Sequence, residues 1–182
     1  MITQIDVRDV LVQMGHGHPD LVTRPTGRAV RSSIETELAR LTGRTVVVLD
    51  FTAVRIIDCS CADEIVAKLL QASLTVASPY EAFFLVRGLH DDQVGEIEEV
   101  LRSQRLALVA ETQSGLQLIG AVADDARVAF EHLAARGRAG VEELAAELAW
   151  PLELVRTTLE ELAERRLLMQ DAGRYHPPTA AA

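Results

Sequence analysis

Apolar and polar positions follow two different patterns over the first 120 residues of the chain, one typical of strands and one of helices. The run at residues 45–50 (TVVVLD) stays apolar and β-branched until it ends at a charge, which is typical of a strand buried on both faces. Further β-rich runs predict strands at residues 82–86, 106–110 and 116–119. Apolar residues at helical spacing predict amphipathic helices at residues 27–41, 60–73 and 91–104. This alternation predicts an α/β layer of helices against a sheet, with residues 45–50 as the central strand.

The pattern changes near residue 120, where strand-like runs give way to leucine and alanine at helical spacing. Helices are predicted at residues 122–135, at residues 141–149 and from Pro151 to about residue 166, and a short hairpin at residues 167–176. We therefore expect two domains, residues 1–120 and 121–176. Each should have its own apolar core, and a protease should reach the boundary near Gly120. Residues 177–182 (PPTAAA) are expected to form a disordered tail.

Length, composition and charge narrow the class of protein. With 182 residues, 48% hydrophobic and 25% charged, the chain suits one medium domain or two small ones and matches a folded globular protein. Its formal net charge of -9 has the wrong sign for non-specific coating of nucleic acid or of an anionic membrane. No apolar run approaches the ~18 residues that span a bilayer, and the start MITQIDVRDV lacks the order of a signal peptide. We expect a cytoplasmic protein without membrane contact.

Residues 46–70 (VVVLDFTAVRIIDCSCADEIVAKLL) are the most informative stretch. They indicate a buried strand, a second short apolar step, and then an aspartate and small polar residues that begin a helix. Ser60 can cap this helix, and Asp63 or Glu64 in the first turn suits the positive end of the helix dipole. The simplest interpretation of Asp58 and Ser60 is therefore a helix cap.

The same stretch resembles the signature of the STAS fold, the anti-sigma-factor antagonist family, in which a VVLDF-like strand leads to Asp-Ser-Ser at a helix N-terminus. It is closer still to STAS-like domains of unknown function, whose segment continues Ala-Asp-Glu, as it does here up to Glu64. The resemblance extends loosely over residues 20–119. It implies a domain that binds a signalling partner or a second copy of itself, through Asp58, Ser60, Asp63 and Glu64.

In the antagonists that this stretch resembles, the serine after the aspartate is phosphorylated, and a kinase-type anti-sigma factor docks on that surface. The matching residue here is Cys59, whose thiol cannot take over serine phosphorylation. Ser60 remains as the candidate phosphate acceptor. A helix N-terminus favours a phosphate there, whereas the neighbouring Asp58, Asp63 and Glu64 oppose it.

The second domain resembles the winged helix-turn-helix domains of bacterial transcription regulators. Residues 141–148 (VEELAAEL), a turn, residues 155–162 (VRTTLEEL) and an apolar pair before the hairpin carry this resemblance. If the domain binds double-stranded DNA, its third helix enters the major groove. The residues available for DNA contacts are then Arg156, Thr157, Arg165, Arg166 and Arg174. Carboxylates at Glu153 and Glu160 oppose phosphate, so DNA and protein both stay open as the target.

The residue spacing argues against metal and catalytic chemistry. Cys59 and Cys61, with His16 and His18, supply four potential ligands, but structural zinc pairs leave two to four residues between cysteines. We interpret both cysteines as free thiols and expect no metal and no cofactor. The chain has no nucleophile motif, phosphate-binding loop or dinucleotide-binding turn, so we expect no enzyme activity.

These observations predict a non-enzymatic bacterial regulator of signalling or transcription. Its STAS-like domain would bind a protein partner or form a homodimer, and its winged helix would carry the output. One alternative is an adaptor or oligomerisation module that contacts proteins only. Another is a small-molecule sensor that uses the apolar interior between sheet and helices as its pocket.

Overall fold

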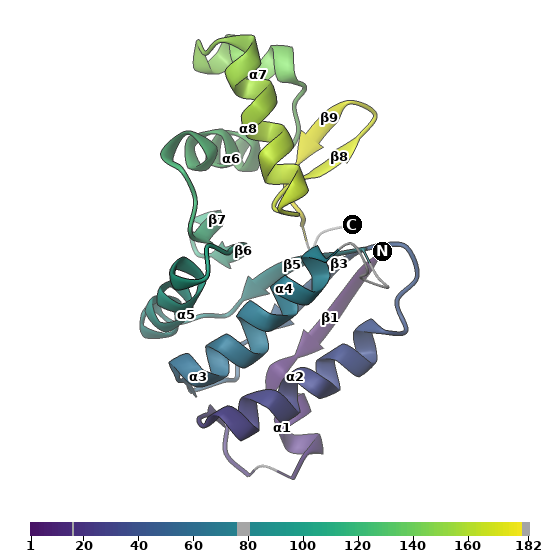
Figure 1. The fold of residues 1–182 in the computed structure, drawn as a ribbon, viewed down its shortest axis with the longest axis vertical. Helices are drawn as coiled ribbons and strands as arrows, with labels where there is room; N and C mark the ends of the chain where they lie inside the picture. The colour runs from purple at the N-terminus through teal and green to yellow at the C-terminus, as the bar shows by residue number, and fades with distance from the viewer. Residues whose placement is uncertain (16, 76–80, 180–182) are drawn as a thin grey trace.

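A computed structural model describes residues 1–15, 17–75 and 81–179 of the chain. The main strands are β1 (Ile2–Asp6), β3 (Arg44–Asp50), β5 (Glu81–Arg87), β6 (Ala107–Thr112) and β7 (Gly115–Gly120). They form one five-stranded sheet in the order β1-β3-β5-β6-β7 (Figure 1). The first four strands are parallel, and β7 pairs with β6 in the antiparallel direction. The fold is therefore mixed α/β, as the alternating pattern predicts.

The strand expected at the centre of the sheet is β3, but β5 occupies the middle position. The reason is β1, which the apolar pattern did not reveal: it pairs with β3 on the side away from β5 and forms the sheet edge. Only Ile5 is buried among its residues Ile2–Asp6, which do not form a continuous apolar run. An edge strand of this kind has a weaker sequence signal than a strand with two neighbours.

Helices cover one face of the sheet. They are α1 (Val7–Gln13), α2 (Arg24–Leu38), α3 (Cys59–Ala62), η1 (Asp63–Ala67), α4 (Lys68–Leu74) and α5 (Asp91–Ser103). The buried residues between these helices and the sheet form a first core, which includes Val47 and Leu49 of β3. The helix predicted at residues 60–73 corresponds to α3, η1 and α4, which follow one another without a break. Its middle part, η1, is π-helical. None of the helices in the described part of the chain is long and apolar enough to cross a membrane.

The other face of the sheet is also covered. The elements predicted after residue 120 are present as α6 (Asp124–Arg136), α7 (Val141–Leu148), α8 (Leu152–Glu164), β8 (Met169–Asp171) and β9 (Arg174–His176). Val46, Val48 and Phe83 of the sheet belong to the same buried cluster as Phe130 of α6 and Leu159 of α8. Each continuous apolar strand therefore contributes alternate residues to two cores.

The expectation of separate cores for residues 1–120 and 121–176 is wrong. The second core contains residues from both segments, because the helices of the first segment cover only one face of an apolar sheet. Gly120 is buried, but the connection after it becomes exposed at Ala123, so protease access near residue 120 stays a prediction. The φ of Gly120, +105°, is in the left-handed region, and a Cβ there would lie 2.4 Å from the Leu106 carbonyl oxygen. Only glycine fits this connection without strain.

Two further regions complete the fold. β2 (Asp20–Leu21) and β4 (Ile56–Ile57) form a small parallel pair that joins the chain before α2 to the chain before α3. The expected disordered tail at residues 177–182 falls partly outside the described residues. Within it, Pro177 and Pro178 are buried and Thr179 is exposed.

Candidate functional site

The carboxylate of Asp58 is occupied by contacts within the chain. Its Oδ1 accepts hydrogen bonds from the Cys61 amide at 2.7 Å and from the Ser60 hydroxyl at 2.8 Å, which makes it the N-cap of α3. Its Oδ2 accepts from the Thr23 amide at 3.0 Å, at the residue before α2. Partial burial raises the pKa of Asp58, but these hydrogen bonds outweigh burial and hold it below its ordinary value. Asp58 thereby fixes the start of α2 against the start of α3.

Ser60 lies in the first turn of α3, half-buried, with its hydroxyl directed to Asp58. A phosphate on Ser60 would replace this hydrogen bond by repulsion between two anions. Phosphorylation of Ser60 stays a prediction, and this contact is the main structural cost that it would have to overcome.

Glu64, expected at an exposed partner surface, is completely buried, so that expectation is wrong. Its Oε1 accepts a hydrogen bond from Arg24 Nη1 at 3.0 Å and another from Lys68 Nζ. Its Oε2 lies 3.3 Å from Arg31 Nη2. Burial raises the pKa of Glu64, but Lys68, Arg24 and Arg31 together hold it below its ordinary value. A carboxylate at this position organises three cations and cannot touch a partner itself.

Asp63 is also held within the chain. Its Oδ2 lies 2.5 Å from Arg24 Nη1, and its Oδ1 accepts from the Gln104 amide at 2.6 Å. Burial raises the pKa of Asp63, but the hydrogen bonds from Arg24 and Gln104 outweigh it and lower the pKa overall. Asp63 therefore links η1 to α2 and to the end of α5.

The close approach of α2 to α3 and η1 depends on a glycine. A Cβ at Gly27 would lie 3.0 Å from Cys61 Cα and 3.1 Å from Glu64 Cβ. With no side chain at Gly27, Arg24 and Arg31, one turn to either side, can reach the Glu64 carboxylate. The π-helical turn of η1 carries that carboxylate, and π-turns of this kind occur frequently at functional sites.

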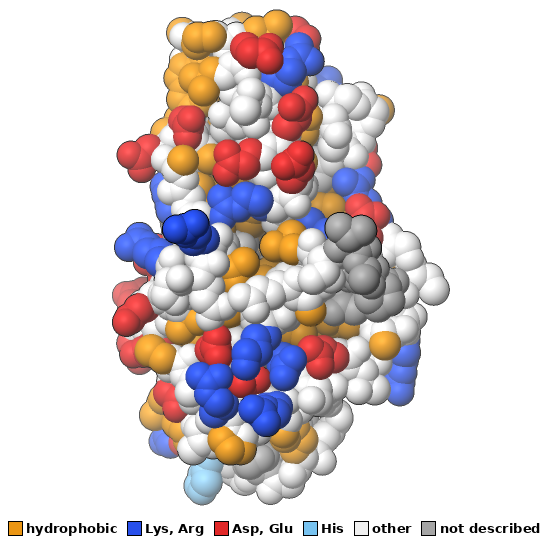
Figure 2. All heavy atoms as spheres, in the orientation of Figure 1, with side chains coloured by type: hydrophobic (Ala, Val, Ile, Leu, Met, Phe, Trp, Pro, Cys, Tyr) orange, Lys and Arg blue, Asp and Glu red, His pale blue; other side chains and the backbone are white. Residues whose placement is uncertain are grey.

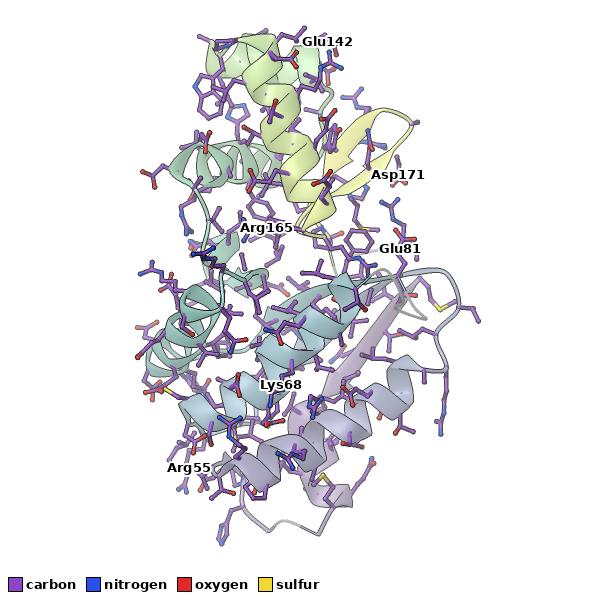
Figure 3. The ribbon with its side chains drawn as sticks, viewed as in Figure 1. Arg55, Lys68, Glu81, Glu142, Arg165 and Asp171 are labelled. Carbon is purple, nitrogen blue, oxygen red and sulfur yellow. The ribbon has the colours of Figure 1, made fainter. Side chains whose placement is uncertain are left out.

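The outer surface of this cluster is cationic. We call it the α2 cationic face, and it consists of Arg24, Arg28, Arg31 and Lys68. Figure 2 shows Lys and Arg side chains gathered over this part of the molecule, and Figure 3 shows Lys68 at the start of α4, beside α2. A shallow open hollow of about 400 Å³ lies along α2 and is lined by Arg24, Pro25, Arg28, Ala29 and Ser32. This face was not among the predicted sites, although arginines at positions 24, 28 and 31 follow helical spacing.

The two thiols are poor nucleophiles and poor metal ligands in this setting. The Cys59 thiol donates to Glu96 Oε2 at 2.6 Å, and this bond, with burial and nearby carboxylates, raises its pKa to about 11. Burial chiefly raises the pKa of Cys61 to about 12, and its thiol donates to the Thr23 carbonyl at 3.1 Å. Both cysteines are free thiols. His16 lies outside the described residues, and the remaining residues contain no cluster that could hold a metal ion.

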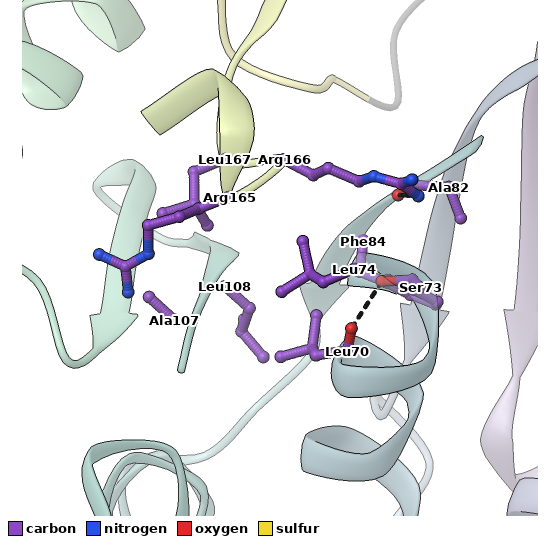
Figure 4. Close-up of a pocket in the computed structure, with 10 residues that line it drawn as sticks. All are labelled: Leu70, Ser73, Leu74, Ala82, Phe84, Ala107, Leu108, Arg165, Arg166 and Leu167. Atoms are coloured by element: carbon purple, nitrogen blue, oxygen red, sulfur yellow. Dashed lines mark hydrogen bonds between the residues drawn. The ribbon is translucent and has the colours of Figure 1, made fainter. Parts of the chain in front are cut away.

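Three of the residues considered for DNA binding make contacts within the chain. Arg165 donates to the Ala121 carbonyl at 2.6 Å, just after β7. Arg166 donates to the Ala82 carbonyl of β5 at 3.3 Å (Figure 4). Arg174 of β9 pairs with Glu143 of α7 at 2.7 Å. These three side chains therefore serve contacts within the chain.

Arg156 and Thr157 lie in the first half of α8, beside a carboxylate. Arg156 lies 3.8 Å from Glu153, and the Thr157 hydroxyl donates to the Glu153 carbonyl at 2.9 Å. Leu152 and Leu154 are exposed at the start of the helix, and four glutamates are exposed along it. We call these glutamates the α8 acidic face, which consists of Glu153, Glu160, Glu161 and Glu164.

The cavities of the described chain differ widely in size, and a hollow of about 400 Å³ lies beside α5, β6 and β7. The cavity between the end of α4, β5, β6 and the end of α8 has a volume of about 10 Å³ (Figure 4). This is room for about one water molecule, far below the ~300 Å³ of a small-molecule site. In comparisons with known proteins, no protein-family model and no curated protein matches the chain.

Proposed function

We propose that the chain is a non-enzymatic signalling protein that works through protein contacts, with a STAS-like α/β unit followed by a winged-helix unit. This is the adaptor alternative of the sequence analysis. The observation that carries it is the charge on α8: four glutamates lie on its exposed side, while Arg165 and Arg166 donate to backbone carbonyls of Ala121 and Ala82.

The order of elements supports the two-unit description. A buried strand, a short second step and an Asp-capped helix occur in sequence at β3, β4 and α3, as in the STAS-like segment. The order α6, α7, α8 and then the β8-β9 hairpin matches that of a winged helix. In this chain the winged-helix unit also closes the second core of the sheet.

The charge distribution argues against DNA as the target. A recognition helix must approach within hydrogen-bond distance of phosphates and bases, and each unpaired carboxylate on it opposes that approach. Glu153 is 85% exposed on the side chain and stands beside Arg156, the one arginine in the first half of α8. Exposed Leu152 and Leu154 at the start of the helix are suited instead to a protein surface.

The chemistry of the polar clusters supports a binding role. The thiols of Cys59 and Cys61 are held as protonated hydrogen-bond donors, and Asp58, Asp63 and Glu64 are ionised acceptors of in-chain hydrogen bonds. None of these groups has the pKa near neutrality that acid–base catalysis favours. A small-molecule sensor would have to use a hollow such as that of about 400 Å³ beside α5, β6 and β7, because the cavity between α4, β5, β6 and the end of α8 holds about one water molecule.

Duplex binding tests the proposal. Fluorescence anisotropy with labelled duplexes from the region upstream of the gene, at ~50 mM salt, should show no saturable binding, because electrostatic attraction to DNA is strongest at low salt. A Glu153→Gln/Glu160→Gln double variant measured in parallel shows how far the two carboxylates suppress binding.

One result would overturn the adaptor proposal in favour of a transcription regulator. It is saturable binding of the wild-type chain that weakens with salt and that Arg156→Ala with Arg174→Ala reduces. The matched control is Arg8→Ala, which removes an exposed arginine from α1, far along the chain from α8.

A further inference from the structure

Two faces of opposite charge lie on the same side of the molecule. In the view of Figure 2, Lys and Arg side chains gather over α2 and the start of α4, while Asp and Glu predominate over α8 at the other end. These are the α2 cationic face and the α8 acidic face. This side of the molecule carries positive charge at one end of its long axis and negative charge at the other. It is therefore complementary in charge to the same side of a second copy that is rotated end for end.

The α2 cationic face has charge left for an external partner. Arg24, Arg31 and Lys68 share the two carboxylates of Asp63 and Glu64. Arg28 is exposed on the same side of the helix, and its side chain has no ion-pair partner within the described part of the chain. Glu35 also pairs with Arg31 at 3.1 Å, so the four cations have three carboxylates beside them, and the positive charge in excess is that of Arg28. Arg24 and Arg28 line the open hollow along α2.

The α8 acidic face has the opposite surplus. Glu160 is exposed and has no ion-pair partner in the described chain. Glu161, whose side chain is 53% exposed, pairs with Arg165 at 3.4 Å. Leu152 and Leu154, at 43% and 40% exposed, add apolar area at the start of the helix. Like charges of this density are costly on a free surface, and an oppositely charged surface relieves them.

We propose that the chain forms a two-fold antiparallel homodimer in which the α8 acidic face of each copy docks on the α2 cationic face of the other. The two-fold axis lies between the two faces, so one geometry makes both contacts and the assembly closes. Leu74 at the end of α4, 38% exposed, lies beside the last residues of α8 and belongs to the middle of this side (Figure 4). The inference rests on the proposed function only in taking these faces as protein-binding surfaces.

A second copy fits these faces better than an unrelated anionic ligand does. DNA or an anionic membrane laid on the α2 cationic face would also meet the α8 acidic face on the same side, and the net charge of -9 opposes both. If two copies made a single contact without a two-fold axis, one copy would keep a free α2 cationic face and the other a free α8 acidic face. Further copies would then add to these faces and form a filament. The closed dimer leaves neither face open.

Charge reversal at Arg28 and Glu160 tests the dimer, because neither side chain makes an ion pair within the described chain. Sedimentation equilibrium of the full chain at ~100 mM salt gives the dimer dissociation constant. Arg28→Glu and Glu160→Arg should each weaken the homodimer by about tenfold or more, since each change puts like charges together in both contacts of the dimer. An equimolar mixture of the two variants should recover nearly wild-type affinity.

The recovery in the mixture is specific to this arrangement. In the mixed dimer, one contact pairs Glu at position 28 with Arg at position 160, and the other contact has the wild-type pair. Arg8→Glu on α1 makes the same change in net charge as Arg28→Glu and should leave the dissociation constant unchanged.

A wild-type chain that stays monomeric at ~100 μM would overturn the proposal, and so would a mixture that remains as weak as its components. Duplex binding is measured separately, so failure of the dimer leaves the result on DNA intact.

Discussion

At the scale of single residues, Glu64 shows how this chain keeps a charge away from solvent. Removing water from a carboxylate costs several kcal/mol, and the cost is offset only where cations and hydrogen bonds replace the water. Here Arg24, Arg31 and Lys68 do so, and each keeps part of its own side chain in solvent. The arrangement buries one anion fully but none of the cations, which lowers the total desolvation cost.

Replacing this carboxylate should destabilise the protein at neutral pH. We expect Glu64→Gln to lower the free energy of unfolding by about 1–3 kcal/mol, because three cations lose their shared anion while remaining partly hydrated. Urea denaturation at pH 7 measures the change. Glu153→Gln, at an exposed position of α8, is the control and should leave the urea midpoint nearly unchanged.

The same variant predicts a pH dependence with a definite sign. The pKa of Glu64 in the folded chain lies below its ordinary value of 4.5, so the unfolded chain binds more protons in acid. The stabilisation is complete above about pH 4.5 and is lost as the pH falls toward the folded pKa. The stability difference between wild type and Glu64→Gln should therefore shrink below pH 4.5. A difference that stays constant down to acid unfolding would contradict this account of the ion cluster.

At the scale of elements, the contact between α2 and the α3–η1 segment depends on the absence of one side chain. Gly27 faces Cys61 and Glu64 at distances that a methyl group can occupy only if backbone shifts. Gly95 in α5 is a contrasting case, because it is exposed and a Cβ there would meet nothing within 4 Å. Two glycines inside helices thus have opposite roles.

Alanine substitutions at these two glycines should have different effects on stability. Gly95→Ala should stabilise the protein by about 0.5–1 kcal/mol, since alanine is the better helix former and meets no obstacle. Gly27→Ala should fall short of that gain or destabilise, by up to about 1–3 kcal/mol, because the added methyl group forces α2 away from η1. Thermal unfolding of both variants checks this. Equal stabilisation at the two positions would mean that the α2–η1 packing is loose.

The elements themselves were largely predictable, whereas their junctions were not. The run at residues 45–50 and the helical spacing of Leu and Ala after residue 120 correspond to β3 and to α6–α8, because these patterns record burial directly. The π-turn of η1 and the two-residue strands β2 and β4 leave no periodic signal. Glu64 was misplaced because a carboxylate near a helix start usually faces solvent, and only the fold brings Arg24 and Arg31 beside it.

At the scale of the whole molecule, the second core joins the two segments of the chain. Phe83 of β5 lies in this core beneath the Arg44 guanidinium, whose Cζ is 5.0 Å from the ring centroid. Arg44 also pairs with Asp171 of β8 at 2.8 Å. Apolar packing and charge pairing therefore both cross from the sheet to the hairpin.

One cooperative unfolding transition should follow from this shared core. Trp150, the only tryptophan, packs against the second core, so its fluorescence reports on the segment after residue 120, while far-ultraviolet circular dichroism reports on all elements. The two urea curves should coincide. Phe83 lies in the sheet, but Phe83→Ala should move both curves together to lower urea, with a loss of about 3–5 kcal/mol in the free energy of unfolding. Val128→Ala, at an exposed position of α6, is the control and should move neither curve. A fluorescence change that precedes the circular dichroism change would indicate two independent domains.

The order in which this shared core is completed matters while the protein is being made. The last strand of the sheet ends at Gly120, but the helix that completes its second cover ends at Glu164. A ribosome therefore releases the whole sheet while Val46, Val48 and Phe83 still have no helix over them. An uncovered apolar sheet is the kind of surface that aggregates or recruits a chaperone. The time needed to translate the last third of the chain thus becomes a determinant of how much protein folds correctly.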